Sequence, residues 1–189
     1  MEAFPHIRII LGMILSLSLA TLLKAAVKFI QHPHRTKPYW IHLLYAFFIF
    51  LELLLFWWWE RKLAGIPHWT FPAYFFTVCY IMTFYGLTSL LFPDDIKDYD
   101  GYEDYFFSRR KWFFGLLAIT NVLDIADTLL KGLEHFYSLN YPYYLATNAA
   151  DIALCIIAMK SSSRRFHAFL IIWLILFKLI DIGRIYFYW

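Results

Sequence analysis

Charged residues and helix-breaking residues are both scarce in this sequence. Only 16% of its 189 residues are charged, and it contains 7 glycines, 7 prolines and 2 cysteines. Soluble domains carry about 25% charged residues, so the composition excludes an ordinary soluble domain. Cys79 and Cys155 lie singly in different apolar runs, without the paired spacing of a metal or redox motif. Both are expected to be small buried residues that say little about the redox compartment.

Apolar residues take the place of the missing charge, since 61% of the chain is hydrophobic and 22% is aromatic. A helix needs about 20 apolar residues to cross a bilayer, so the chain has room for roughly six or seven spans and little else. We predict an all-α polytopic integral membrane protein with a single transmembrane domain over residues 1–189. The expected spans cover residues 7–30, 39–59, 71–92, 112–130, 141–159 and 166–187.

Residues 94–111, between the third and fourth spans, have a different composition. Acidic and aromatic residues alternate there, and the aromatic residues at positions 99, 102, 105 and 106 share one helix face. The segment ends in the basic cluster Arg109-Arg110-Lys111. This pattern predicts an amphipathic segment lying along the membrane interface, although Gly101 weakens the helical pattern.

The fifth span is the one richest in small residues. Small side chains allow close approach between helices in a membrane, so we expect this helix to be a central one. The residues concerned are Ala146, Thr147, Ala149, Ala150 and Ala153.

Lysine and arginine cluster after the first, third and fifth spans. By the positive-inside rule these connections are cytoplasmic, which leaves both termini outside. The formal net charge is only +3, and the basic residues stand at the ends of apolar runs. They therefore indicate topology, and nucleic acid is not an expected partner.

Ionisable side chains inside the spans lie at one depth, about 16–22 Å from the cytoplasmic end at the usual helical rise. The carboxyl groups outnumber the bases by five to two. In a low dielectric such a surplus requires protonation, a bound cation or entry of water from the outer face. The acidic residues are Glu52, Asp124, Asp127, Asp151 and Asp181, and the basic residues are Lys178 and Arg184.

Asn121 and Asn148 each lie one turn before an aspartate and are expected to supply amide hydrogen bonds or carbonyl ligands to the same layer. We therefore predict a small transporter or channel for protons or cations, which uses these nine residues and acts in the lipid bilayer as a homo-oligomer or with a membrane-complex partner.

Two other interpretations remain open. In the first, the polar layer is internal glue, that is, a set of ion pairs that only holds the helices together. Lys178 would then pair with Asp151 or Asp124, and Arg184 with Asp127 or Asp181. In the second, the protein is a non-catalytic membrane subunit or assembly factor that docks a partner protein through its aromatic surface.

An enzymatic function is disfavoured, because the chain has no Gly-rich phosphate loop, no Ser-centred nucleophile motif and no His-Glu-x-x-His zinc motif. No cofactor is predicted. His42 and His167 lie near cytoplasmic ends of two spans and could present imidazoles to a haem or a metal. Such histidines more often cap or hydrogen-bond at the interface.

Several short segments resemble unannotated bacterial inner-membrane proteins. They cover mainly the first two spans and the start of the fourth. The resemblance implies a bacterial inner-membrane location and implies no activity. The segments are His32-Pro33, Arg35, Pro38-Tyr39-Trp40, His42, Phe56-Trp57-Trp58 and Arg110-Lys111-Trp112-Phe113.

Overall fold

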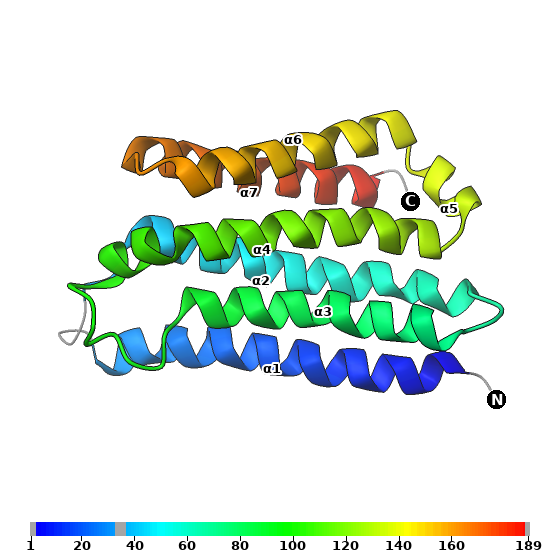
Figure 1. Cartoon of the computed structure of the whole chain (residues 1–189), viewed down its shortest axis with the longest axis horizontal. Helices are drawn as coiled ribbons and strands as arrows, with labels where there is room; N and C mark the ends of the chain where they lie inside the picture. Colours follow the sequence, from blue (N-terminus) through cyan, green and yellow to red (C-terminus); the bar gives the residue numbers. More distant parts are fainter. Residues whose placement is uncertain (1–2, 33–36, 188–189) are drawn as a thin grey trace.

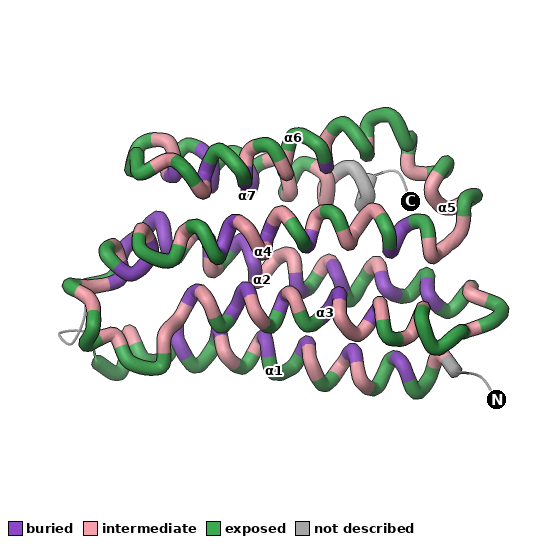
Figure 2. Tube along the Cα trace, in the orientation of Figure 1, coloured by how far each residue is buried: buried purple, intermediate pink, exposed green. Residues whose placement is uncertain are grey.

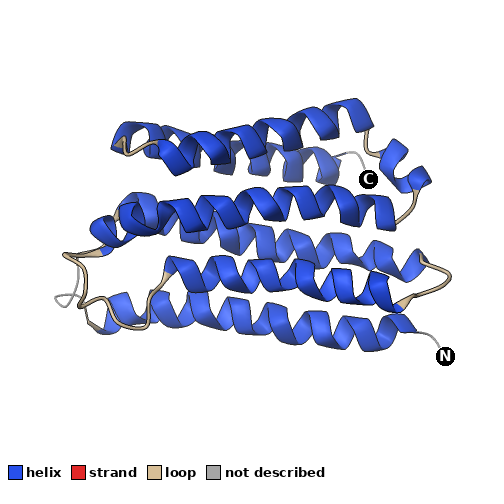
Figure 3. Cartoon of the chain, in the orientation of Figure 1, coloured by secondary structure: helices blue, strands red, loops and turns tan. Residues whose placement is uncertain are grey.

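The computed structural model describes the backbone of residues 3–32 and 37–187, and the side chains of residues 4–32 and 37–183. Every regular element in these ranges is helical (Figure 3). The elements are α1 (Ala3–Gln31), α2 (Trp40–Trp59), the 3-10 helix η1 (Glu60–Gly65), α3 (Phe71–Leu91), α4 (Tyr102–Leu130), α5 (Leu133–Ser138), α6 (Tyr141–Lys160) and α7 (Arg164–Phe187).

Six of the described helices are long and apolar enough to cross a membrane. They are α1, α2 with η1, α3, α4, α6 and α7. The prediction of an all-α chain with six apolar helices of membrane-spanning length is therefore confirmed.

The long helices run side by side and alternate in direction (Figure 1). α1 packs on α2 and α3, α4 packs on α3 and α6, and α7 packs on α2. The start of α1 and the end of α7 consequently lie at the same end of the bundle (Figure 1). The α6–α7 hairpin lies along one edge of the bundle, and α1 lies along the opposite edge.

The short helix α5 turns the chain between α4 and α6. Gly132, with a φ of 112°, and Asn140, with a φ of 52°, both adopt the left-handed region at its two ends. Glycine takes this conformation without a Cβ penalty, and asparagine tolerates it better than most residues. These turns hold Lys131 and His135 against the end of the bundle.

Buried residues follow the helix faces that meet inside the bundle, and exposed residues follow the outer faces (Figure 2). Tyr45, Leu53 and Phe114 have no exposed surface. The outer faces carry large apolar side chains, including Phe71 at 74% and Trp112 at 70% exposure. Apolar side chains on the outside are what a hydrocarbon environment requires.

The interfacial segment predicted over residues 94–111 is not confirmed. Residues 94–101 form turns and bends, and the following residues are the first turns of the continuous helix α4. The aromatic face of Tyr102, Tyr105 and Phe106 is buried, because it packs against α2 and the end of α3. An aromatic stripe beside acidic residues fits a membrane surface and a protein core equally well, and here tertiary packing decided between them.

The expectation that the fifth span is central was wrong. The corresponding helix α6 lies at the edge of the bundle (Figures 1 and 2), and only Asn148, Cys155 and Ala158 are buried in it. The alanines at positions 146, 149, 150 and 153 are exposed. Small residues permit close packing between helices, but their presence does not show which helix packs there, or whether one does.

α3 and α4 approach each other closely at Gly86. A Cβ added at this residue would lie 2.8 Å from Cδ2 of Leu116 on α4. One turn away, the hydroxyl of Thr120 donates to Oγ1 of Thr83 at 3.1 Å across the same interface. Glycine at position 86 therefore sets the spacing of the two helices that flank the polar interior.

We expect Gly86→Leu to destabilise the protein by about 1–3 kcal/mol, because the new side chain must displace Leu116 and part the two helices. The apparent melting temperature in detergent should fall by several degrees. Gly65→Leu is the matched control, since an added Cβ there meets no atom within 4 Å. Equal melting temperatures for the two variants would contradict a tight α3–α4 contact.

Candidate functional site

A cavity of about 690 Å³ lies between α2, α3, α4, α6 and α7. One end of it is lined by Lys131, His135 and Asn140, and we call this end the mouth. Seven of the nine predicted site residues line the cavity, although they come from four different helices. They are Glu52, Asn121, Asp124, Asn148, Asp151, Lys178 and Asp181.

Of the other two predicted residues, the structure describes the side chain of one. Asp127 is only 1% exposed and is turned to a buried ion pair beside the cavity. The side chain of Arg184 lies outside the described part of the structure. The pairing of Lys178 with Asp151 or Asp124, expected if the layer were internal glue, is not found, because Lys178 bonds Glu52. Asp127 bonds Lys131, and the pairings expected for Arg184 lie outside the described side chains.

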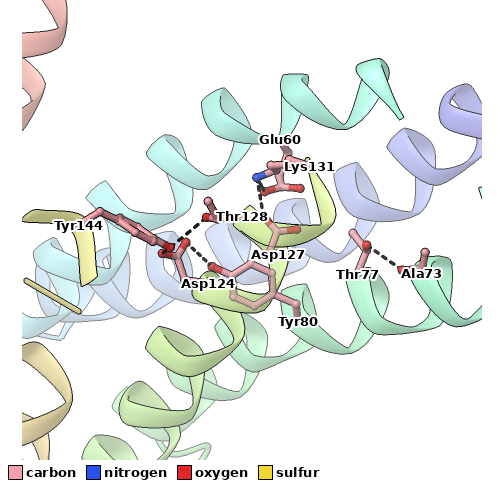
Figure 4. A network of polar contacts seen from close by, with 9 residues as sticks. All are labelled: Glu60, Ala73, Thr77, Tyr80, Asp124, Asp127, Thr128, Lys131 and Tyr144. Carbon is pink, nitrogen blue, oxygen red and sulfur yellow. Dashed lines mark hydrogen bonds and ion pairs between the residues drawn. The ribbon is translucent and has the colours of Figure 1, made fainter. Parts of the chain in front are cut away.

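A buried triad of one base and two acids lies at the mouth (Figure 4). The Nζ atom of Lys131 lies 2.8 Å from Oε1 of Glu60 and 2.5 Å from Oδ2 of Asp127. All three side chains are 5% exposed or less. One ammonium cannot neutralise two carboxylates, so the ionised triad has a surplus of one negative charge in a poorly solvated place.

The charge state of Lys131 results from opposing effects. Burial alone would lower the pKa of this lysine, but the neighbouring Asp127 and Glu60 carboxyls raise it above its ordinary value of 10.5. A raised folded-state pKa contributes stability that is present below the unfolded-state pKa and lost as pH rises through the folded value. The lysine therefore stays charged, and stabilises the fold, throughout the neutral range.

Asp124 is held by hydroxyl groups, without an ammonium partner among the described side chains (Figure 4). Tyr80 donates to its Oδ1 at 3.1 Å, and Tyr144 donates to its Oδ2 at 2.6 Å. Because Tyr144 has only one proton, Thr128 must be the donor in the 2.9 Å bond between their hydroxyls. The chain of donors ends at the carboxylate and stabilises its negative charge.

Deeper in the cavity, Lys178 of α7 lies 2.8 Å from Oε1 of Glu52 on α2. Their side chains are 28% and 19% exposed, against 5% for Lys131 and Glu60, so this pair faces the cavity more openly. Asp151 interacts with Lys178 only through space. Among the described residues it makes no hydrogen bond or ion pair.

The two asparagines are tied to their own helices. Nδ2 of Asn121 donates to the carbonyl oxygen of Leu117 at 3.0 Å, and Nδ2 of Asn148 donates to that of Tyr144 at 3.1 Å. Their amide nitrogens are therefore committed within the helix, four residues back, as is common for short polar side chains in apolar surroundings.

Five residues of the site were missed from the sequence. Lys131 had a usable signal, because it lies four residues after Asp127 on a helix. Glu60 lies between the expected second and third spans, and the two tyrosines and the threonine carry no charge that would mark them within a span. The missed residues are Glu60, Tyr80, Thr128, Lys131 and Tyr144.

His135 adds no positive charge to the mouth at neutral pH. Partial burial lowers the pKa of this histidine, and the nearby charges of Lys131 and Lys62 lower it further. Apart from Asp181, which has a contact of its own, the described walls and triad hold five carboxyl groups against two ammonium groups. The cavity is therefore an acidic environment in which protons, water or a cation must offset the surplus.

The inner end of the cavity is closed by an aromatic plug, formed by His42, Tyr45, Phe106, Phe114 and His167. Phe114 belongs both to the cavity wall and to the plug. Its ring stacks on His167 at 5.3 Å and meets Tyr45 edge-on at the same distance. Tyr45, His42 and His167 are completely buried, so the plug separates the cavity from the basic end of the bundle.

The two histidines of the plug cap helix ends. Nε2 of His42 donates to the carbonyl oxygen of Leu91 at 2.6 Å, and Nε2 of His167 donates to that of Ser161 at 3.0 Å. These carbonyls lie at the ends of α3 and α6, where the helix offers no donor of its own. The contacts favour capping over the haem or metal interpretation of this pair.

The short α6–α7 connection, residues 161–163, is held at the basic end beside the plug. Nη2 of Arg110 donates to Oγ of Ser162 at 2.9 Å, and Arg164 pairs with Glu103. Together with the bond of His167 to Ser161, these contacts fix the closed end of the hairpin to the start of α4.

Six membrane-length apolar helices around a polar interior define a multi-pass α-helical membrane protein. Comparison of the chain with protein-family models, with curated proteins and with solved structures gives no match.

We expect Lys131→Met to destabilise the protein by about 3–5 kcal/mol, because it leaves two buried carboxyl groups without an ammonium. The loss should be smaller at pH 5 than at pH 8, since protons can then replace the missing charge. The loss of stability is measured by unfolding the wild type and the variant in detergent at both pH values. Lys111→Met, which changes an exposed lysine, is the control. A loss that is the same at both pH values would argue against the charge surplus.

Proposed function

We propose that the protein is a small membrane transporter for protons or cationic solutes, and that the acidic cavity is its binding site. The observation that carries the proposal is that carboxyl groups from α2, α4, α6 and α7 line one cavity and outnumber the described ammonium groups. Intramembrane ionisable groups are costly and mark ion or substrate pathways by default.

The difference between the two ion pairs supports a division of roles. The Glu60–Lys131–Asp127 triad is enclosed and stabilises the connection through α5. The Glu52–Lys178 pair faces the cavity beside Asp151, which has no described partner of its own. A cation or proton that reaches Asp151 changes the field at Lys178, so occupancy of the site and the pairing of this lysine are linked.

The aromatic plug supports a transporter over an open channel. At its inner end the cavity is lined by Phe114, whose ring packs against the other rings of the plug. A channel needs a continuous polar path, whereas a transporter needs a site that is accessible from one side at a time.

We also propose a bacterial inner-membrane location, with both termini outside and the mouth on the outer side. The connections and helix ends at the plug end carry most of the basic residues, as the cytoplasmic side of a membrane protein does. They include Lys97, Arg109, Arg110, Lys111, Arg164 and Arg165.

Replacing Asp151 by asparagine should abolish flux of protons or cations while leaving assembly unchanged, because the variant removes a cavity charge that no described ion pair uses. The measurement is uptake into liposomes containing the purified full-length protein. Asp98→Asn, in an exposed connection, is the matched control. If the wild type gives no flux and a partner protein co-purifies with it, the role of a docking subunit replaces transport.

Cysteine accessibility tests the orientation. In a Cys79→Ala, Cys155→Ala background, we expect Lys97→Cys to react with a membrane-impermeant reagent only after the cells are opened. Lys62→Cys, at the opposite end, should react in intact cells. The reverse result would invert the topology.

A further inference from the structure

We propose that the cargo of the cavity is an organic cation, in which an ammonium group is carried on an aromatic or apolar body. This inference rests on the proposed function, and it narrows that function from cations in general to one chemical class.

The size of the cavity favours a ligand of many atoms. Its volume of about 690 Å³ lies within the roughly 300–1,000 Å³ typical of small-molecule sites. A bare metal ion instead needs several ligands that converge at about 2.0–2.6 Å. In the described part of the chain, no three His, Cys, Asp or Glu side chains are grouped so that they could hold one.

The wall of the cavity is largely apolar and contains several aromatic rings. An inorganic cation gains nothing from such a wall and would keep its water, whereas an apolar body gains by leaving water. Ring faces also attract an ammonium group directly. The rings come from α2, α3, α4 and α7, and belong to Phe48, Phe56, Trp59, Phe84, Phe114 and Phe177.

The polar groups of the wall call for a positive head group. The two described ammonium groups are engaged, Lys131 with Glu60 and Asp127, and Lys178 with Glu52. Asp124 accepts only from hydroxyl groups.

An independent observation comes from Glu60, which lines the cavity and has a side chain that is only 5% exposed. Its Oε2 atom receives no hydrogen bond from a described N–H or O–H donor, and the carboxyl group also contacts that of Asp127, whose Oδ1 atom is unpartnered in the same way. A buried acceptor without a donor is costly, and an ammonium in the cavity would satisfy it.

The test is equilibrium binding to the purified full-length protein in detergent, by calorimetry at neutral pH. The probe is benzyltrimethylammonium. Two comparison compounds separate its parts: N-benzylacetamide keeps the benzyl group without the charge, and tetramethylammonium keeps the charge without the ring. Sodium chloride is added as an inorganic competitor.

We expect benzyltrimethylammonium to bind more tightly than either comparison compound and to resist displacement by sodium. Asp151→Asn should weaken its binding about thirtyfold, which corresponds to about 2 kcal/mol, and Asp98→Asn should leave it unchanged. The inference is overturned if the neutral amide binds the wild type equally well, or if sodium displaces the probe at equal concentration. Unchanged affinity in a folded Asp151→Asn variant would also overturn it.

Liposome flux separates this inference from the proposed function. Flux of protons or sodium without binding of benzyltrimethylammonium would leave transport standing and refute the organic cation. Binding without any flux would leave the ligand class standing and refute transport.

Discussion

A carboxyl group inside a low-dielectric bundle must find a proton, a hydrogen-bond donor or a cation, and this requirement organises the interior of the protein. Hydrogen-bond donors and cations both fill this need within about three turns of helix. Lys131 forms ion pairs with Glu60 and Asp127, and Lys178 forms one with Glu52. Two tyrosine hydroxyls donate hydrogen bonds to Asp124. The partners come from α2, α3, α4, α6 and α7, so the charges join helices that apolar contacts alone would hold less specifically.

The same requirement explains where the interior is empty. A tightly packed apolar core forms at the aromatic plug around Tyr45, and buried apolar residues such as Leu53 and Leu63 continue it towards the mouth. Beside the carboxyl groups, the helices separate enough to leave about 690 Å³. The interior thus combines an apolar core with a polar cavity.

The spans and most of the charged cavity residues could be predicted from the sequence because both follow from local patterns. Long apolar runs predict spans, and charges within them are rare enough that Glu52, Asp124, Asp151 and Lys178 could each be selected singly. Their depths could be compared by helical rise, which is why they were expected in one layer. The pairings could not be reached, since Lys178 meets Glu52 through the way α7 lies on α2.

Other features depended on tertiary context in the same way. The aromatic residues from 102 to 106 looked interfacial and proved to be core, and the small residues of α6 looked central and proved to be exposed. In both cases the residue types limit what the helix face can pack against. Which helix, if any, lies against that face depends on the packing of the whole bundle. Tyr80 and Tyr144 were missed for a related reason. The sequence does not show to which carboxylate a tyrosine in a membrane span will donate a hydrogen bond.

The fixation of the short α6–α7 connection determines what kind of motion could open or close the cavity. Arg110, Arg164 and His167 hold that connection at the plug end, whereas the other ends of the two helices are at the mouth. At the mouth end, the bonds of Tyr144 to Asp124 and Thr128 hold α6 to α4, so the hairpin can tilt there only if these bonds break. A tilt of α6 and α7 would widen the cavity most at the mouth. It would disturb the packed rings least, so the plug would stay intact.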